Sequence, residues 1–185
     1  WPALKVLPPF GLAPGQGGLD SARGSGQASA TMIDLRPTGY VIGLLIAALG
    51  FAMVPPMLVD LAEGREEWPV FFESAVLTLF VGSLTALACR DTRNNGLTIQ
   101  QAFILTVGTW AILPLFGALP FVMGATEARL VDAYFEAMSG LTTTGATVFS
   151  ELESLPKGLL LWRGILQWLG GLGIVIVAML FLPIM

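Results

Sequence analysis

Residues 142–147 have the sequence TTTGAT, and their types and spacing could bind a cation. A cation that crosses a membrane must exchange its water shell for equivalent ligands, and the backbone carbonyl groups of an extended Thr/Gly-rich strand can supply them. Gly145 permits backbone angles that aim its carbonyl group inward, and it has no side chain to block the path. The threonine hydroxyl groups add further oxygen ligands. The segment is therefore a candidate cation-coordinating loop.

The residues before this loop predict a short helix that would carry it. Residues 131–140 are enough for a helix of about 15 Å, half the thickness of a bilayer core. Asp132 suits the cap or first turn of this helix, and Gly140 suits its C-terminal stop. The partly negative C-terminal end would favour a cation near the middle of the membrane. A threonine run by itself is more often an ordinary polar loop, so the position between two apolar spans is what favours ion coordination.

Four apolar stretches are long enough to cross a bilayer, which takes about 20 residues. Three of them contain no charged residue, and the second contains only Glu73. The stretches are residues 37–59, 68–89, 98–123 and 164–185.

Prolines and tryptophans mark positions within these stretches. Pro55 and Pro56 are expected to kink or fray the first span, and Pro114 and Pro120 to bend the third. The tryptophans expected at the membrane interface are Trp68, Trp162 and Trp168.

The composition excludes several other classes of protein. The 185 residues are 55% hydrophobic and 12% charged, against roughly 25% charged in an ordinary soluble domain. There is no histidine, so an imidazole base or a histidine metal site is excluded, and the single Cys89 cannot form an internal disulfide. The net charge of −4 offers no basic patch for nucleic acid. Because no acid has a catalytic partner beside it in the sequence, we do not expect an enzyme.

Three regions follow from these patterns. Residues 1–31 are rich in Gly, Pro, Ser and Ala and are expected to be a disordered or artefactual leader, with Met32 as the natural start. Residues 32–95 are predicted to be a two-helix membrane region, and residues 96–185 a span–short helix–loop–span unit. Arginines are nearly balanced between the two sides, but Arg90 and Arg93 in a short turn favour a cytoplasmic N-terminus.

Two motifs, in this order, resemble a known family of membrane proteins. Residues 132–148, DAYFEAMSGLTTTGATV, resemble the first pore loop of the TrkH/KtrB superfamily of potassium transporters. Residues 161–163 (LWR) and 167–174 (QWLGGLGI) resemble the start of the helix that follows. The resemblance covers about residues 32–185. It implies an all-α integral membrane fold, with two N-terminal transmembrane helices followed by one helix–pore-loop–helix repeat of an expected four, arranged around a pseudo-fourfold pore.

The resemblance also implies which residues coordinate the ion. Aligned with the Thr-Val-Gly-Tyr-Gly filter of potassium channels, Thr143, Thr144 and Gly145 fall on Thr-Val-Gly, and their carbonyl groups are expected to bind K⁺. Thr142 lies at the inner end of this filter. A serine at the position of Gly145 accompanies sodium preference in related plant transporters, so this sequence looks like the potassium-permeable type.

Further residues are expected to support the loop or pack the helices. Glu136 is expected to be a buried acid that supports the filter, rather than a surface acid at the outer mouth, and Gly140 to end the short helix beneath it. Arg163 is expected either to anchor the last span at the interface or to pair with Glu136 or Asp132 behind the filter. The small residues expected to allow close helix packing are Gly170, Gly171 and Gly173.

The function implied by the resemblance is that of a pore-forming subunit for potassium uptake across the inner membrane. The alternatives are a sodium-permeable or sodium-coupled transporter of the same superfamily and a membrane assembly module that does not transport. The implied partners are the lipid bilayer, K⁺, a second copy of the full-length protein and a cytoplasmic nucleotide-binding regulatory subunit (TrkA/KtrA-like), with no cofactor bound by this chain. One loop cannot surround an ion, so the chain is expected to be an N-terminal fragment that does not conduct alone.

Overall fold

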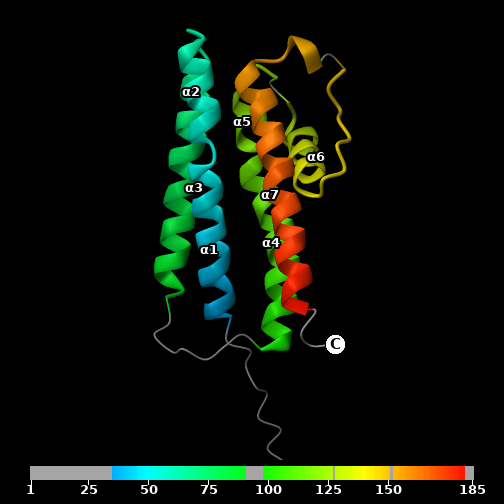
Figure 1. Ribbon diagram of the computed structural model, residues 1–185. Helices are drawn as coiled ribbons and strands as arrows, with labels where there is room; N and C mark the ends of the chain where they lie inside the picture. The colour runs from blue at the N-terminus through cyan, green and yellow to red at the C-terminus, as the bar shows by residue number, and fades with distance from the viewer. Residues whose placement is uncertain (1–34, 91–97, 127, 151, 182–185) are drawn as a thin grey trace, which may run out of the picture. The chain divides into compact units, whose positions relative to one another are not determined.

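A computed structural model describes residues 35–90, 98–126, 128–150 and 152–181, and every regular element among them is a helix (Figure 1). The expected leader, residues 1–31, and Arg93 lie outside the described residues. Four helical stretches are long and apolar enough to cross a membrane, as predicted: Arg36–Ala62, Trp68–Ala88, Ile99–Met123 and Lys157–Ile176. In chain order the elements are α1 (Arg36–Phe51), α2 (Val54–Ala62), α3 (Trp68–Ala88), α4 (Ile99–Gly117), α5 (Leu119–Met123), α6 (Leu130–Leu141), a 3₁₀ turn η1 (Leu152–Ser154) and α7 (Lys157–Phe181).

The first span is interrupted where the sequence predicts a kink. Helix α1 ends at Phe51, and Pro55 and Pro56 lie in the first turn of α2. Proline is tolerated there, because the N–H groups of the first turn have no acceptor within the helix. Helices α1 and α2 run beside α3 (Figure 1). Two glycines allow α1 and α3 to approach closely, because a Cβ atom on Gly43 or on Gly82 would lie 2.5 Å from a backbone nitrogen of the opposite helix. Close backbone contact through small residues is typical of helices packed in membranes.

The third span is also interrupted by proline. Helix α4 starts with a capping box, in which Thr98 Oγ1 accepts from the Gln101 N–H and Gln101 Oε1 accepts from the Thr98 N–H. Helix α4 contains Pro114 and ends at Gly117, and Pro120 is the second residue of α5. The Phe121 N–H turns to the carbonyl oxygen of Ala118 at 3.0 Å, which leaves the Gly117 carbonyl without its helical donor.

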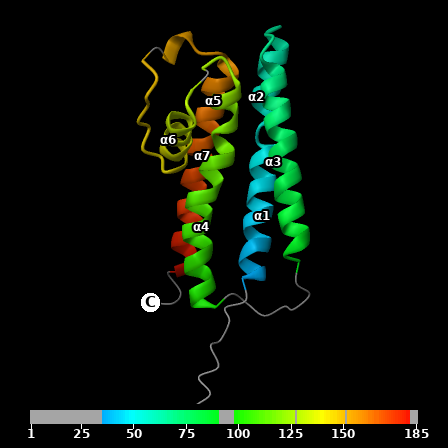
Figure 2. The ribbon, with the colours of Figure 1, turned by 180° about the vertical axis from the view of Figure 1, so that it is seen from behind.

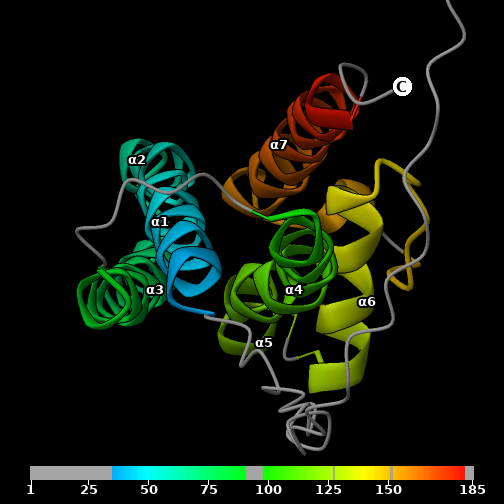
Figure 3. The same cartoon turned by 90° about the horizontal axis from the view of Figure 1, so that it is seen from below.

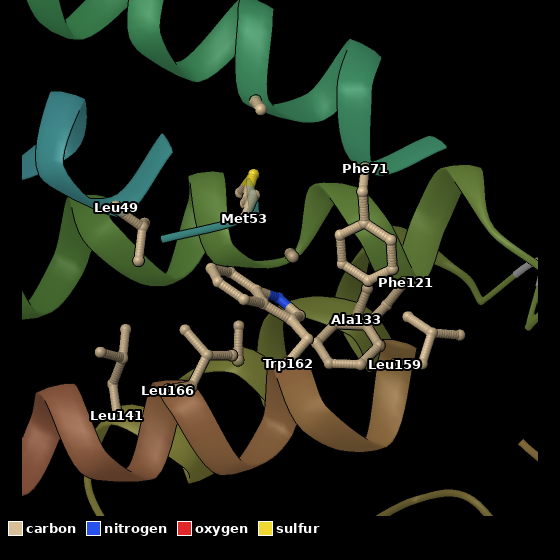
Figure 4. Packing of buried hydrophobic residues seen from close by; sticks show 12 residues of the cluster. Leu49, Met53, Phe71, Phe121, Ala133, Leu141, Leu159, Trp162 and Leu166 are labelled. Carbon is tan, nitrogen blue, oxygen red and sulfur yellow. The ribbon is translucent and has the colours of Figure 1, made fainter. Parts of the chain in front are cut away.

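Trp162 of α7 supplies a donor in its place. Its indole Nε1 donates to the Gly117 carbonyl at 3.0 Å, and the side chain is fully buried. Its ring packs edge-on against Phe71, with centroids 6.4 Å apart, at the centre of the apolar cluster in Figure 4. The prediction that Trp162 lies at the membrane interface is therefore wrong, whereas Trp168 is 69% exposed. The cluster joins α1, α3, α5, α6 and α7.

Helix α7 begins seven residues before the predicted start at residue 164. The charge of Arg163 sets the predicted start of this apolar span, but the arginine lies inside the helix and is paired with an acid of α6. The short helix α6 matches the predicted residues 131–140 to within one residue at each end. It packs against α4 and α7 (Figures 2 and 3).

Candidate functional site

Helix α6 ends at Leu141, and its end is closed by the threonines that follow. The Thr143 N–H donates to the Gly140 carbonyl at 2.9 Å, and the Thr144 N–H donates to the Ser139 carbonyl at 3.0 Å. This hydrogen-bond pair defines a Schellman motif, in which the residue after the cap takes a left-handed conformation. Gly140 is therefore a residue inside the helix, and the prediction that it stops the helix is wrong.

The left-handed position of the motif is held by Thr143, with φ of 57°. Glycine normally occupies such a position, because a β-branched side chain there costs about 1–2 kcal/mol. Strained residues of this kind persist only where the surroundings fix them, and they concentrate at functional sites. The outlier therefore singles out this turn as a site where geometry matters more than local stability.

The loop turns again at Gly145, whose φ is 75°. The N–H groups of Thr144 and Gly145 both point to the Ser139 carbonyl, at 3.0 and 3.4 Å. Two left-handed residues, Thr143 and Gly145, do not fit the predicted extended strand, so the loop is curved. The curvature follows from the Ser139 carbonyl, which accepts from two successive N–H groups.

The threonine hydroxyl groups bind within the loop and to the end of α6. Thr142 Oγ1 donates to the Met138 carbonyl at 2.8 Å and lies 2.8 Å from Thr144 Oγ1. Ser139 Oγ donates to the Ala146 carbonyl at 2.6 Å. By contrast, the carbonyl groups of Thr143, Thr144 and Gly145 accept no hydrogen bond from the described residues. These three residues are exposed, so their oxygens are available as ligands.

Glu136 links the second half of the loop to α6. The residue is buried, and Oε1 accepts from Thr147 Oγ1 at 2.5 Å and from the Val148 N–H at 2.6 Å. Both donors lie beyond Gly145, so Glu136 closes the loop back onto the helix that carries it. Hydrogen bonds to an ionised acceptor are stronger than those between neutral groups.

The second oxygen of Glu136 faces α7. Arg163 Nε lies 3.1 Å from Glu136 Oε2, and the two side chains are 19% and 0% exposed. Of the two roles expected for Arg163, pairing with Glu136 agrees with this geometry and interfacial anchoring does not. Asp132 has a different partner, because it accepts from Arg129 Nε at 2.8 Å near the start of α6. That hydrogen bond raises the pKa of the exposed Arg129 guanidinium.

Glycines set the distance between α6 and α7. A Cβ atom on Gly170 would overlap the Leu141 carbonyl group, and a Cβ atom on Gly140 would lie 3.0 Å from Leu166 Cβ. Gly171 is less crowded, with Thr143 Cγ2 at 3.9 Å, and Gly173 has no described atom within 4 Å of the corresponding position. Gly140 and Gly170 are thus the close-contact positions of this helix pair.

A pocket of about 330 Å³ lies between the loop and α7. Gly145 and Gln167 both line it and lie close together, because a Cβ atom on Gly145 would be 3.3 Å from Gln167 Nε2. The sequence predicts no role for Ser139 or Gln167, and it places Thr147 only within the loop, although all three lie in the quoted motifs. Within the described residues, no three Asp, Glu or Cys side chains converge on one point, so the candidate ligands here are backbone oxygens.

Comparison with known proteins identifies the family. The family model described as "TrkH: Cation transport protein" matches residues 67–185. The chain belongs to the TrkH family. Membership in a family of cation transport proteins confirms the predicted resemblance and the expectation that the chain is not an enzyme, and with four apolar helices it makes the chain a membrane protein.

Relatives with curated names match most of this TrkH-family chain. It is 40% identical over 152 residues to the Trk system potassium uptake protein TrkH of Halomonas elongata, covering 82% of this chain and 31% of that protein. It is 36% identical over 146 residues to TrkH of Escherichia coli (strain K12), covering 78% and 30%. The crystal structure of the potassium transporter TrkH from Vibrio parahaemolyticus matches with a TM-score of 0.74 at 36% identity, covering 80% of this chain and 32% of that one. The chain thus spans about a third of the length of these relatives.

Proposed function

We propose that this TrkH-family chain contributes one ion-coordinating loop to a potassium uptake transporter. The carbonyl oxygens of Thr143, Thr144 and Gly145 coordinate K⁺ in this loop, and Thr142 lies at its inner end. K⁺ is the transported ion, and no resident cofactor is involved.

The observation that carries the proposal is that the donors and the carbonyl groups of the loop are used differently. The N–H groups of residues 142–145 and the hydroxyl groups of Thr142 and Thr144 form hydrogen bonds within the loop and to the end of α6, while the carbonyl groups of residues 143–145 accept no hydrogen bond from the described residues. A carbonyl group left free at membrane depth is tolerated where it lines a cavity or meets a ligand. Backbone oxygens of this kind replace the hydration shell of a transported cation.

The neighbouring residues have supporting roles in this proposal. Glu136 and Arg163 hold the loop, and Gly140 and Gly170 let α7 approach α6. Gly171 and Gly173 allow close packing with further segments of the complete transporter.

The relatives are named as potassium uptake proteins, which supports K⁺ as the substrate. A sodium-permeable transporter would have the same loop chemistry, so K⁺ and Na⁺ transport are distinguished by an uptake assay. The complete reading frame that contains this chain is expressed in bacteria that lack their own potassium uptake systems. We expect growth at low K⁺ concentration and uptake of Rb⁺ tracer that a large excess of Na⁺ does not suppress. Uptake driven or dominated by Na⁺ would favour the sodium alternative, and no uptake of either ion would favour an assembly module.

The organisation of the complete transporter is part of the same proposal. Residues 32–95 form an N-terminal two-helix region and residues 96–185 the first span–loop–span repeat. The protein lies in the inner membrane with a cytoplasmic N-terminus, assembles as a homodimer and binds a cytoplasmic nucleotide-binding regulatory subunit of the TrkA/KtrA type. Labelling of single cysteines placed before Arg36 and after Glu63 with a membrane-impermeant reagent tests the orientation.

A further inference from the structure

A buried acid at the end of the first span contacts the start of the last one. Asp60 of α2 is fully buried, and its Oδ1 accepts from the Gly158 N–H at 2.9 Å across 98 residues of sequence. Gly158 is the second residue of α7, so its N–H is one of the first four that have no acceptor within the helix. Asp60 therefore caps α7 from another helix, with its charge at the positive end of the helix dipole.

The contact requires glycine on the side of α7. A Cβ atom on Gly158 would overlap the carboxyl group of Asp60. A second link lies nearby, because Glu63 pairs with Lys157, but these side chains are 28% and 69% exposed and solvent weakens the pair. The buried link through Asp60 is thus the specific one.

The cap lies close to the residue that holds the ion-coordinating loop. Arg163 follows Gly158 by five residues, about 7.5 Å along the same helix. Arg163 pairs with Glu136, and Glu136 accepts from Thr147 and from the Val148 N–H. A change in the position or rotation of the start of α7 is transmitted through this rigid helix to Arg163 and then to the loop.

We infer that Asp60 is a positioning residue for ion selectivity: by fixing the N-terminus of α7 it sets the position of Arg163, Glu136 and the loop. The inference rests on the proposed function and extends it to the first two spans, which have no pore loop of their own. Stability alone does not account for this acid. Its Oδ2 is buried without a hydrogen-bond partner among the described residues, and burying an unpaired charged oxygen is unfavourable.

The test uses the complete reading frame in bacteria that lack potassium uptake, with four variants. Asp60→Ala removes the cap, and Gly158→Ala displaces the carboxylate without removing it. Asp60→Asn keeps an acceptor oxygen for the Gly158 N–H. Glu63→Gln is the matched control, because it breaks the exposed link between the same two helix ends. The amount of protein in the membrane, the apparent KM for Rb⁺ uptake and the inhibition of that uptake by Na⁺ are measured for each.

We expect Asp60→Ala and Gly158→Ala to raise the apparent KM about fivefold, the factor that corresponds to the roughly 1 kcal/mol typical of a helix cap, and to increase inhibition by Na⁺. Asp60→Asn keeps the acceptor but loses its charge, so it should raise the KM less than Asp60→Ala, and Glu63→Gln should stay close to the parent protein in both measurements. A merely structural role would lower the amount of protein and the maximal rate but leave the KM and the Na⁺ inhibition unchanged, and that result overturns the inference.

The outcomes separate this inference from the proposal on which it rests. Absence of K⁺ uptake by the parent protein refutes the proposed function itself. Uptake by the parent protein, together with parental KM and Na⁺ inhibition in Asp60→Ala, refutes only the positioning role. If Asp60→Ala does not accumulate in the membrane, Gly158→Ala decides by the same criterion, because it retains every charged group.

Discussion

The substitution Glu136→Gln removes the charge that joins α6, the loop and α7. The glutamine side chain would keep an oxygen for Thr147 and for the Val148 N–H, but both hydrogen bonds would lose their charge assistance. On the other side, the amide group would face Arg163 Nε, which now has a carboxylate oxygen at 3.1 Å. The change is nearly isosteric, so its effects report the charge and not the shape of the side chain.

The expected cost follows from these contacts. A hydrogen bond to a charged group contributes about 1 kcal/mol more than a neutral one, and two such bonds are affected, which gives about 2 kcal/mol. Breaking a buried ion pair costs about 3–5 kcal/mol, and we reduce this to about 2 kcal/mol because the Arg163 side chain is 19% exposed. The sum of about 4 kcal/mol corresponds to a shift of roughly a thousandfold against the ordered loop.

The assay is Rb⁺ uptake by the complete transporter in cells that lack their own potassium uptake. We expect Glu136→Gln to raise the apparent KM at least tenfold at an unchanged amount of protein in the membrane. Asp132→Asn is the matched control on the same helix, because it breaks a pair whose arginine is 84% exposed, and such pairs contribute about 0–1 kcal/mol. A parental KM in Glu136→Gln would refute the reasoning, as would equal effects of the two substitutions.

Three further substitutions test the packing and the turns of this region. Gly170→Ala should lower the free energy of unfolding of the purified transporter by about 1–3 kcal/mol, because the added methyl group overlaps the carbonyl at the end of α6. Gly171→Ala, at an uncrowded position, should have little effect, and equal effects of the two substitutions would contradict this assignment. Gly145→Ser should reduce K⁺ uptake relative to Na⁺ uptake, because it adds a side chain at a φ of 75° beside the proposed ligands; an unchanged ratio in a flux assay would rule it out. Trp162→Phe should leave the Gly117 carbonyl buried without a donor and cost about 1–3 kcal/mol, and an unaltered melting temperature would disprove this.

The spans and the short helix could be predicted because their signals are local. An apolar run of about 20 residues is sufficient evidence for a membrane helix, and proline marks an interruption wherever it occurs. The breaks before Pro55 and Pro120 and the limits of α6 therefore agree with the sequence. The sequence predicts the contacts around Glu136 in part: a buried Glu136 that supports the loop, and an Arg163 that pairs with it in one of two expected roles.

Other features depend on contacts between distant residues. The predicted start of α7 lies seven residues after the true one, because a charged residue such as Arg163 marks the boundary of an apolar run until its partner on α6 is known. Trp162 looks interfacial until the Gly117 carbonyl is seen to lack its helical donor. Asp60 has no local sequence signal at all, since its partner is a backbone N–H 98 residues away.

The turn after α6 shows a different limit. Gly140 was predicted to stop the helix because glycine is the usual left-handed residue. The left-handed position belongs instead to Thr143, and the glycine is needed for contact with Leu166. Residue preferences could not decide this, because the close packing of Gly140 against α7 outweighs them.

The central claim is that the carbonyl groups of Thr143, Thr144 and Gly145 bind the transported ion. The most direct measurement is a crystal structure of the complete transporter with Tl⁺, a monovalent cation that substitutes for K⁺ and scatters anomalously. We predict an anomalous peak in contact with these three carbonyl groups, and its loss when excess K⁺ competes with Tl⁺. A clear Tl⁺ peak elsewhere in the transporter, with none at this loop, would contradict the claim.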